Sequence, residues 1–510
     1  AHHSKRADIS SLEKRGNVFF LGAKPYEDLP NYMQYFDVCI EPRIAEKDIP
    51  PPTKVFDYLA SGKPVVATNV EELDWLKDNI NLINCKEDFL EAIKEVLVND
   101  TEISKIARIK KAEENSWQIR AENICREIDR IRSKKKLLVL PTYYIDPEKM
   151  KIRIIELAKG LSIYYRTYLL AWNASVSSNI VIRALTCLLD LFTPRRIYKL
   201  KSLNMVRFPL LHRPLNPALK FNSYFLRDFI KREAIDIVLN GSFHMFSIDK
   251  KRDFKYVLDL ADMPTEDKKS SFGKFKYRQT GIEAQKADLV SAVSAGLAYY
   301  IKQDYKIEPK VLVNGAYLNK FRLINSTDVS RIKDKYCMAD KFIIGYAGMI
   351  GSWVDVDFLV KVFKEVKKQI PEALILLVGP CPNLKQLRSR YAEDDIIITG
   401  IVSNKEIETY INCFNLAVLP HVKNPYQDMA FHIKLIEYTA ARKMVVSTPL
   451  DEVKRLNFPN IIVADMDVGS WAKALLKAKD MVWPNDWDSL VEKYDWKEIV
   501  SCLNSLIEGL

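Results

Sequence analysis

Features typical of many secreted and membrane-spanning proteins are missing from this sequence of 510 residues. Its eight cysteines are scattered without a Cys-x-x-Cys pair, so neither a zinc site nor a disulfide framework is indicated, and a reducing compartment fits best. No apolar run reaches the roughly 18 to 20 residues that a membrane span needs, and the first residues do not resemble a signal peptide. We therefore expect a cytoplasmic protein.

Two kinds of functional motif are also missing. The sequence contains no recognised nucleic-acid-binding motif, so we expect no nucleic-acid partner. No Asp-x-Asp metal motif stands in a convincing loop, because the pair Asp355 and Asp357 resembles the start of a helix. We therefore expect no metal requirement. What is present is the composition of a folded protein, with 48% hydrophobic and 11% aromatic residues, and the length suggests three or four domains.

The most informative feature is a duplication. Residues 16–43 run alongside residues 395–422, and residues 53–68 run alongside residues 433–448. In each copy a terminal amphipathic helix follows, opened by Ser116-Trp117 or by Asp495-Trp496. Three separated blocks that share nearly one offset predict one complete module and a part of another.

Strands alternate with helices from Lys136 onward, which predicts parallel sheets with crossover helices. The expected strands form two sets, at residues 136–313 and 342–464, with a break near residues 321–334. Residues 1–131 would hold only the later part of such a domain, because nothing in them matches the first two strands of the second copy. Either the chain is a fragment of a longer tandem protein, or this piece is a docked accessory domain. The fragment is favoured, because missing strands would leave apolar edges uncovered.

Ligands of open parallel sheets collect at the carboxyl ends of the strands, where turns and helix N-termini offer N–H groups to phosphates. Gly348 and Gly351 follow the first strand of the second set and would let the backbone approach a diphosphate, although a tight turn without a ligand is the alternative. Lys434 and Glu437 lie three apart, on one helical face, where the cation can neutralise a diphosphate and the acid can bind ribose hydroxyls. An ordinary exposed ion pair is the alternative for this pair.

The first copy repeats the pair as Lys54 and Asp57, within the run PPTKVFDYLASGKPVVAT at residues 51–68. This run resembles the donor-site signature of GT-B glycosyltransferases that build bacterial surface polysaccharides, such as teichuronic-acid and xanthan enzymes and family 4-like members. Residues 345–359 resemble the family's first donor-domain loop. The segments 287–301 and 311–321 resemble the end of its acceptor domain.

The resemblance implies an α/β GT-B fold of two Rossmann-like domains with parallel sheets, preceded by a partial donor-type domain. The implied boundaries are 1–131 for the partial domain, 132–325 for the acceptor domain, 326–480 for the donor domain and 481–510 for helices crossing back toward the acceptor domain. We expect no transfer activity from residues 1–131 alone.

The implied function is sugar transfer from a nucleotide-diphosphate donor, with a uridine or guanosine base, to a saccharide or lipid-linked acceptor in cell-surface polysaccharide synthesis. The donor would lie against Gly348, Gly351, Lys434 and Glu437 without a cofactor, and Lys434 would act catalytically by stabilising the departing diphosphate. Two alternatives share this fold: a noncatalytic scaffold that binds a partner, and a sugar-nucleotide epimerase, which needs no acceptor.

The second copy departs from the family pattern. Many retaining members carry two glutamates eight residues apart, whereas here Met429 stands eight before Glu437, with Asp428 beside it. In the first copy, Asp48 is nine residues before Asp57, as Asp428 is before Glu437. Asp428 is therefore a candidate for the missing donor-binding glutamate. Retention or inversion at the anomeric carbon stays open.

The acceptor side offers three candidates. Asp259 and Asp262 end an expected strand, where a carboxylate could remove or orient the proton of an acceptor hydroxyl, and Asp262 is the catalytic candidate. A helix N-cap or a solvated loop is the alternative for Asp262. His244 ends another strand and could bind acceptor or diphosphate, although a lone histidine is more often structural.

The net charge of +11 is concentrated in residues 183–232, where eleven Lys or Arg residues face two acids. Mixed with Leu, Phe and Tyr, these cations suit an anionic membrane surface, at about 1 kcal/mol each. That would make the protein peripheral on the inner face of the cell membrane. A solvated basic face around the nucleotide-sugar cleft is the alternative.

Overall fold

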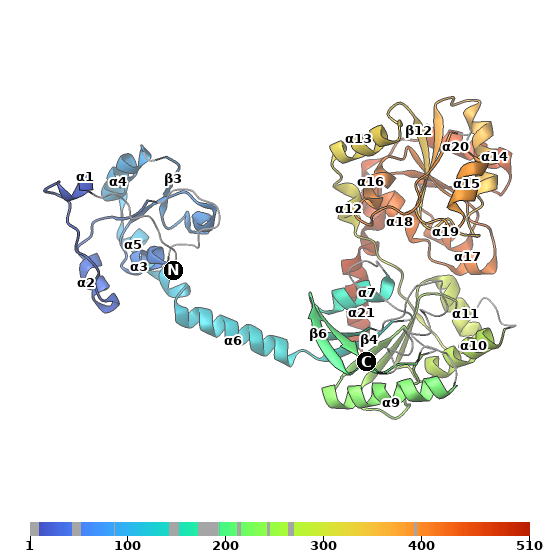
Figure 1. Cartoon of the computed structure of the whole chain (residues 1–510), viewed down its shortest axis with the longest axis horizontal. Helices are drawn as coiled ribbons and strands as arrows, with labels where there is room; N and C mark the ends of the chain where they lie inside the picture. The colour runs from blue at the N-terminus through green and yellow to red at the C-terminus, as the bar shows by residue number, and fades with distance from the viewer. Residues whose placement is uncertain are drawn as a thin grey trace. The chain divides into compact units, whose positions relative to one another are not determined.

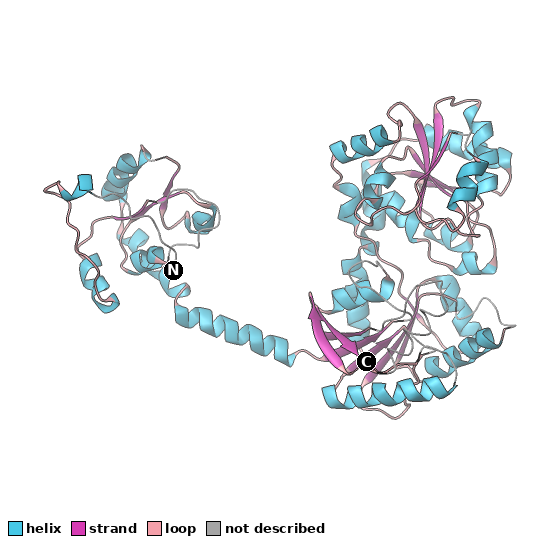
Figure 2. Cartoon of the chain, viewed as in Figure 1, coloured by secondary structure: helices cyan, strands magenta, loops and turns pink. Residues whose placement is uncertain are grey.

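The protein is described by a computed structural model, shown by residue number in Figure 1 and by secondary structure in Figure 2. The described residues are 10–42, 53–85, 87–141, 152–171, 192, 194–211, 216–241, 245–263, 270–391 and 395–510. The chain divides into two compact units, an amino-terminal unit at residues 1–133 and a main unit at residues 134–510.

The amino-terminal unit is built on a parallel sheet of three strands in the order β1-β2-β3. Val55 and Leu59 of the helix α3 are fully buried against it. The elements of the unit are α1 (Ser10–Glu13), η1 (Tyr26–Asp28), α2 (Leu29–Met33), β1 (Cys39–Glu41), α3 (Lys54–Ala60), β2 (Val65–Thr68), η2 (Glu71–Leu76), β3 (Asn81–Ile83), α4 (Asp88–Asn99), α5 (Glu102–Glu114) and α6 (Trp117–Ser133).

One apolar segment of this unit is uncovered. Phe19, Phe20 and Leu21 are 79%, 51% and 56% exposed and belong to no strand. By the sequence correspondence they match residues 398–400 of the main unit, where the strand β14 (Ile396–Ile398) ends beside its neighbour. The described residues of 10–133 contain no such neighbouring strand for residues 19–21 to pair with.

The first lobe of the main unit is an eight-stranded sheet in the order β11-β10-β9-β8-β4-β5-β7-β6. Among the described strands of this sheet, β6 and β7 form the one antiparallel pair. Strands such as β4 and β8 are buried on both faces, which is why they are continuous apolar runs. The elements are β4 (Lys136–Leu140), α7 (Arg153–Leu161), β5 (Arg166–Leu170), β6 (Arg196–Leu200), β7 (Leu203–Arg207), α9 (Asn216–Glu233), β8 (Ile237–Asn240), β9 (Lys255–Leu260), α10 (Ser271–Ala284), β10 (Leu289–Ala292), α11 (Ala295–Tyr305) and β11 (Lys310–Val311).

The second lobe is a six-stranded parallel sheet in the order β14-β13-β12-β15-β16-β17, with helices on both faces (Figure 2). Leu318 and Phe321 of the helix α12 already belong to its core. The elements are α12 (Leu318–Arg322), α13 (Ser326–Lys335), β12 (Phe342–Ala347), α14 (Val356–Lys367), β13 (Ala373–Val378), α15 (Leu384–Arg390), β14 (Ile396–Ile398), α16 (Ile407–Asn412), β15 (Leu416–Leu419), α17 (Pro425–Met429), α18 (Ile433–Ala440), β16 (Met444–Ser447), α19 (Asp451–Leu456), β17 (Ile461–Val463) and α20 (Val468–Lys479).

The chain then returns to the first lobe. After η3 (Asn485–Tyr494), the helix α21 (Trp496–Glu508) packs beside α7 (Figure 1). Val500 and Leu503 of α21 are buried in the first lobe's core. Gly160 of α7 allows the close approach, because a Cβ there would lie 2.3 Å from a methyl group of Val500. Among the described residues, no helix combines the length and apolar character needed to cross a membrane.

Candidate active site between the two lobes

The second lobe has a topological switch point between β12 and β15. The strands on one side of it run β12, β13, β14 and those on the other β15, β16, β17, so the loops after β12 and β15 diverge and leave a crevice. In open α/β sheets, ligands bind in such a crevice, outside the carboxyl ends of the strands. The loop that begins at Gly348 and the helix α18 both lie at this place.

Gly348 and Lys434 are in direct contact there. Gly348 has a φ of +147°, and a Cβ on it would lie 2.2 Å from Cε and 2.8 Å from Nζ of Lys434. Only glycine therefore combines this backbone with room for the lysine. Gly379, after β13, has a φ of +132° and lies so close that its Cβ would be 2.3 Å from the Gly348 carbonyl oxygen. Gly351 instead packs on an aromatic ring, since its Cβ would meet Trp353 at 2.5 Å.

The Lys434 ammonium is buried beside the Gly348 turn. Among the described residues it forms no hydrogen bond or ion pair, and it lies 5.7 Å from the centroid of the Tyr346 ring. Burial lowers the pKa of Lys434, and the nearby Glu437 carboxylate acts in the opposite direction. A desolvated cation without a hydrogen-bonded partner is costly, so this one is suited to receive an anion.

Two buried histidines lie near this lysine, and neither belongs to one of the predicted motifs. His421 follows β15 and contacts Gln427 at 2.9 Å through Nδ1, while the Nε2 of His432 lies 3.0 Å from the Gln427 carbonyl oxygen. Burial lowers the pKa of His421 to about 3 and that of His432 to about 4, and the charge of Lys434 adds to both shifts. Both rings are therefore neutral at physiological pH, and Lys434 supplies the positive charge. Their positions beside a strand end and before α18 were the only sequence signals.

Glu437 lies on the side of α18 that faces the first lobe. With Ile433 it lines a cavity of about 150 Å³, whose opposite wall includes Arg153, Glu156 and Tyr317. The glutamate of this helix thus reaches the space between the lobes, while the lysine lies against the Gly348 turn. This arrangement suits a ligand with an anionic group at one end and hydroxyl groups at the other.

Asp428 has other partners. Its Oδ1 accepts hydrogen bonds from Lys423 Nζ at 3.0 Å and from the Asp451 amide at 3.1 Å, and its side chain is 18% exposed. These contacts tie α17 to the start of α19. They fit a role in positioning α17.

On the first lobe, the two aspartates differ. Asp259 is buried, and its carboxylate accepts hydrogen bonds from Nε and Nη2 of Arg153, both at 2.8 Å, and from the hydroxyl of Ser291. Asp262 is exposed and faces the second lobe, where Tyr426 of α17 donates a hydrogen bond to it at 3.3 Å. Asp262 is thus the carboxylate that lies open to the space between the lobes. His244 lies outside the described residues.

The lobes touch at the amino end of α11. The Gly296 amide donates to Oε1 of Glu452 at 2.7 Å, and the Ser294 hydroxyl donates to the Met429 carbonyl oxygen. A Cβ on Gly296 would lie 3.1 Å from Cα of Met429, so glycine allows this close approach. The contact brings α17, with Tyr426, over the first lobe.

The matching pair in the amino-terminal unit has a different setting. Lys54 is exposed, and Asp57 accepts a hydrogen bond at 3.0 Å from the hydroxyl of Tyr26. The described residues of that unit include no strand and turn equivalent to β12 and Gly348. Asp48 lies outside the described residues.

The basic segment is only partly described, and part of its charge is paired. Of residues 183–232, Arg195 pairs with Asp228 and Glu233, whereas the edge strand β6 leaves Arg196, Lys199 and the nearby Lys201 exposed. Within the part of the chain that is described, no group of three or more His, Cys, Asp or Glu side chains could hold a metal ion.

Comparisons with known proteins agree with this geometry. Two stretches, residues 2–99 and 341–480, match the family described as "Glycosyl transferases group 1". The Bacillus subtilis protein TuaH, named as a candidate glycosyltransferase of teichuronic acid biosynthesis, is 28% identical over 121 residues, which is 23% of this chain and 30% of TuaH. An uncharacterised glycosyltransferase of Methanocaldococcus jannaschii is 20% identical over 297 residues, which is 55% of this chain and 69% of that protein.

Solved structures share the architecture of the main unit. The Anabaena protein HepE in complex with UDP superposes with a TM-score of 0.52 and 14% identity, covering 74% of this chain and 100% of HepE. At that level of identity the likeness concerns the fold, and the fold is GT-B, with two Rossmann-like domains facing each other. The predicted fold class is thereby confirmed.

Proposed function

We propose that this chain, which has the GT-B fold, is a glycosyltransferase that transfers a sugar from a nucleoside-diphosphate donor to a saccharide or lipid-linked saccharide acceptor in the space between its two lobes. The observation that carries the proposal is the buried ammonium of Lys434, which forms no ion pair with any described residue and lies against Gly348 at the switch point of the second lobe's sheet. The diphosphate of a bound donor would be the anionic partner of this ammonium.

The donor would extend from this point toward the first lobe. Its diphosphate would lie on the Gly348 turn and Lys434, and Glu437 would accept hydrogen bonds from the ribose. The complex of HepE with UDP supports a uridine nucleotide as the first donor to test, with guanosine as the alternative base. The name of TuaH supports a role in cell-surface polysaccharide synthesis.

The chemistry follows from which groups carry charge. As the bond from the sugar to the diphosphate breaks, negative charge builds on the leaving oxygen, and Lys434 would stabilise it in a site with little water. His421 and His432 are neutral, so they would orient groups by hydrogen bonds without adding charge. On the other side, Asp262 would accept the proton of the acceptor hydroxyl in an inverting reaction, or orient that hydroxyl in a retaining one.

A lipid-linked acceptor would bring the protein to a membrane surface. The edge strand β6 supports this, because it leaves Ile197 and Tyr198 exposed beside Arg196 and Lys199. Apolar and basic side chains on one exposed edge suit the headgroup region of an anionic bilayer.

Release of the nucleoside diphosphate tests the proposal. The full chain would be incubated with UDP-sugars and GDP-sugars, with and without saccharide and lipid-linked acceptors, and the freed UDP or GDP measured. We expect UDP or GDP to be released only when an acceptor is present. Asp262→Asn should lower the rate of this release without weakening donor binding. Conversion of the sugar nucleotide without any acceptor would instead identify an epimerase. Absence of both donor binding and turnover would identify a noncatalytic scaffold.

A further inference from the structure

The main unit contains a large cavity far from the crevice at Lys434. Its volume is about 660 Å³, within the range of 300 to 1,000 Å³ typical of small-molecule sites. Residues at its wall stand at the amino ends of the first lobe's strands: Lys135 precedes β4, Asp236 precedes β8 and Asp288 precedes β10. The candidate active site lies at the carboxyl ends, so the two sites are on opposite edges of this sheet.

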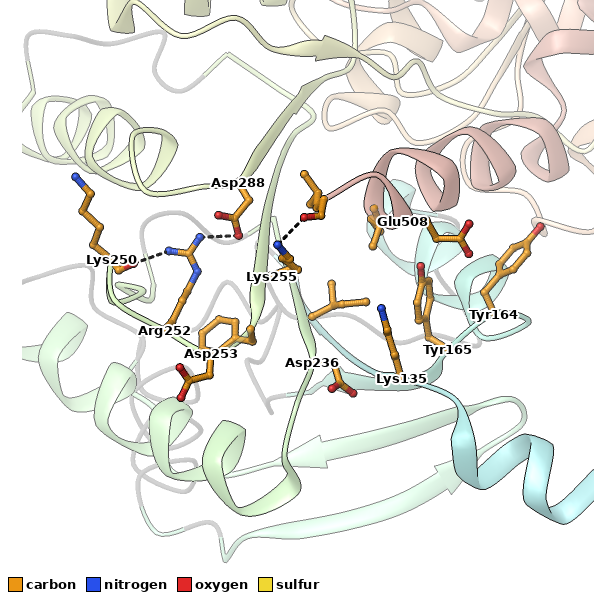
Figure 3. Close-up of a pocket in the computed structure, with 14 residues that line it drawn as sticks. Lys135, Tyr164, Tyr165, Asp236, Lys250, Arg252, Asp253, Lys255, Asp288 and Glu508 are labelled. Atoms are coloured by element: carbon orange, nitrogen blue, oxygen red, sulfur yellow. Dashed lines mark hydrogen bonds and ion pairs between the residues drawn. The ribbon is translucent and has the colours of Figure 1, made fainter.

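The charges at this cavity balance. Its lining contains four cations, Lys135, Lys250, Arg252 and Lys255, and four carboxylates, Asp236, Asp253, Asp288 and Glu508. Figure 3 shows them spread around the cavity, with both signs at each end. A wall of this kind gives a polyanion such as a nucleotide no net attraction. It favours a neutral ligand that both donates and accepts hydrogen bonds.

Several of these charged groups already form hydrogen bonds or ion pairs within the protein. Asp236 accepts a hydrogen bond from the Lys136 amide at 2.7 Å, and Asp288 accepts one from the Tyr256 amide at the same distance, so both carboxylates hold strand starts. Arg252 pairs with Asp288 at 2.7 Å. These contacts make the floor of the cavity rigid.

Other groups have no partner. The hydroxyl of Tyr165 and the Nε of Arg252 are both buried, and neither has a hydrogen-bond partner. Tyr165 as a whole is 5% exposed. The side chains of Lys135, Lys250 and Asp253 also make no hydrogen bond or ion pair with any described residue. Burial and the charge of Glu508 raise the pKa of Tyr165 to about 12, so its hydroxyl keeps its proton and can donate. Buried polar groups without partners are rare in native proteins, and each calls for a ligand or a bound water.

An aromatic wall stands at one end. Tyr164 is 39% exposed, and its ring centroid lies 6.5 Å from that of Tyr165. Figure 3 shows the two rings side by side below α21, where Glu508 lies above the Tyr165 hydroxyl. An exposed ring next to polar groups is the arrangement that binds the apolar face of a ring-shaped polar ligand.

We propose that this cavity binds a short, uncharged oligosaccharide, with one sugar ring on Tyr164 and hydroxyl groups on Lys135 and Asp253. A sugar supplies both donors and acceptors for unpaired groups of both kinds, and it carries no charge that the balanced wall would oppose. The inference goes beyond the proposed transfer reaction, because a saccharide can bind here whether or not the space between the lobes is active.

Binding of three defined probes to the full chain tests the inference. Cellotetraose, maltotetraose and mannotetraose would be titrated by calorimetry and by saturation-transfer NMR. We expect at least one to bind, Tyr164→Ala to weaken it about tenfold or more, and Tyr165→Phe, which removes only an unpaired hydroxyl, to weaken it less. Tyr224→Ala is the matched control, because Tyr224 is a 64% exposed tyrosine on α9 outside the cavity lining.

The result that would overturn the inference is clear. It fails if none of the three probes binds, if Tyr164→Ala binds as well as the unaltered chain, or if UDP displaces the oligosaccharide. Lys434→Ala should leave oligosaccharide binding unchanged. If the unaltered chain binds an oligosaccharide but no nucleotide, the donor site at Lys434 is wrong and the oligosaccharide site stands. If it binds a nucleotide but no oligosaccharide, the oligosaccharide site is wrong and the donor site stands.

Discussion

Acidification should destabilise the second lobe through its two buried histidines. In the unfolded chain both have a pKa near 6.5, whereas burial lowers the pKa of His421 to about 3 and of His432 to about 4 in the folded chain. At pH 7.5 both are neutral in either state. At pH 5 the unfolded chain binds a proton at each while the folded chain binds almost none, so stability falls as the pH falls.

The size of the effect follows from these pKa values. A pH of 5 is about 1.5 units below the pKa of each histidine in the unfolded chain. At about 1.36 kcal/mol per unit, each histidine therefore lowers the free energy of unfolding by about 2 kcal/mol at this pH. For a lobe of this size, about 2 kcal/mol corresponds to a shift of about 4 to 8 °C in the unfolding temperature. His421→Asn removes one titrating group and keeps a side-chain N–H for Gln427.

Thermal unfolding at pH 7.5 and pH 5 measures this. The full chain and the variants His421→Asn, His432→Asn and the double variant would be compared, each against itself at the two pH values. Each single variant should lose about 4 to 8 °C less on acidification than the unaltered chain, and the double variant least. Equal losses in all four proteins would refute the reasoning, since the loss would then come from other groups.

Three further predictions concern the crevice, the first lobe and the membrane edge. Gly348→Ala should abolish stabilisation by UDP or GDP in a thermal-shift assay, because the added Cβ displaces Lys434; Gly351→Ala should only weaken it, and equal effects would contradict the assignment. Arg153→Met should destabilise the first lobe by about 3 to 5 kcal/mol in denaturant unfolding, because it leaves a carboxylate buried without its cation, and a change below about 1 kcal/mol would contradict this. Replacing Lys199 and Lys201 by Glu should remove sedimentation with phosphatidylglycerol vesicles, and unchanged sedimentation would exclude β6 as the contact.

The fold could be predicted from the sequence because its signals are local and repeated. Buried parallel strands are continuous apolar runs, and the run from Phe342 to Ala347 followed by Gly348 is of this kind. Gly348 has a positive φ and contacts Lys434, so a tight turn follows this strand, and binding of a diphosphate there stays a prediction. Many helices carry a lysine and an acid three residues apart. The helix of Lys434 could be distinguished from them because the first copy repeats the pair as Lys54 and Asp57.

The rest depends on contacts between distant residues, which a sequence pattern does not record. Asp259 lies near the end of β9 and Asp262 just after it. Arg153, 106 residues away, neutralises Asp259, so of these two aspartates it is Asp262 that lies open to the second lobe. His421 and His432 acquire their lowered pKa values only when burial brings them together beside Lys434. The cavity at the amino ends of β4, β8 and β10 is formed with α21, which the sequence places far from those strands.

The most direct test of the account is nucleotide binding by Lys434→Ala. Thermal unfolding of the full chain would be measured with UDP, GDP, ADP and the matching sugar nucleotides, beside Lys405→Ala, which removes an exposed lysine of the same lobe. We predict that one nucleotide stabilises both the unaltered chain and Lys405→Ala, and that Lys434→Ala loses this stabilisation while it remains folded. Equal stabilisation of Lys434→Ala, or no stabilisation of the unaltered chain by any nucleotide, would contradict a donor site at Lys434.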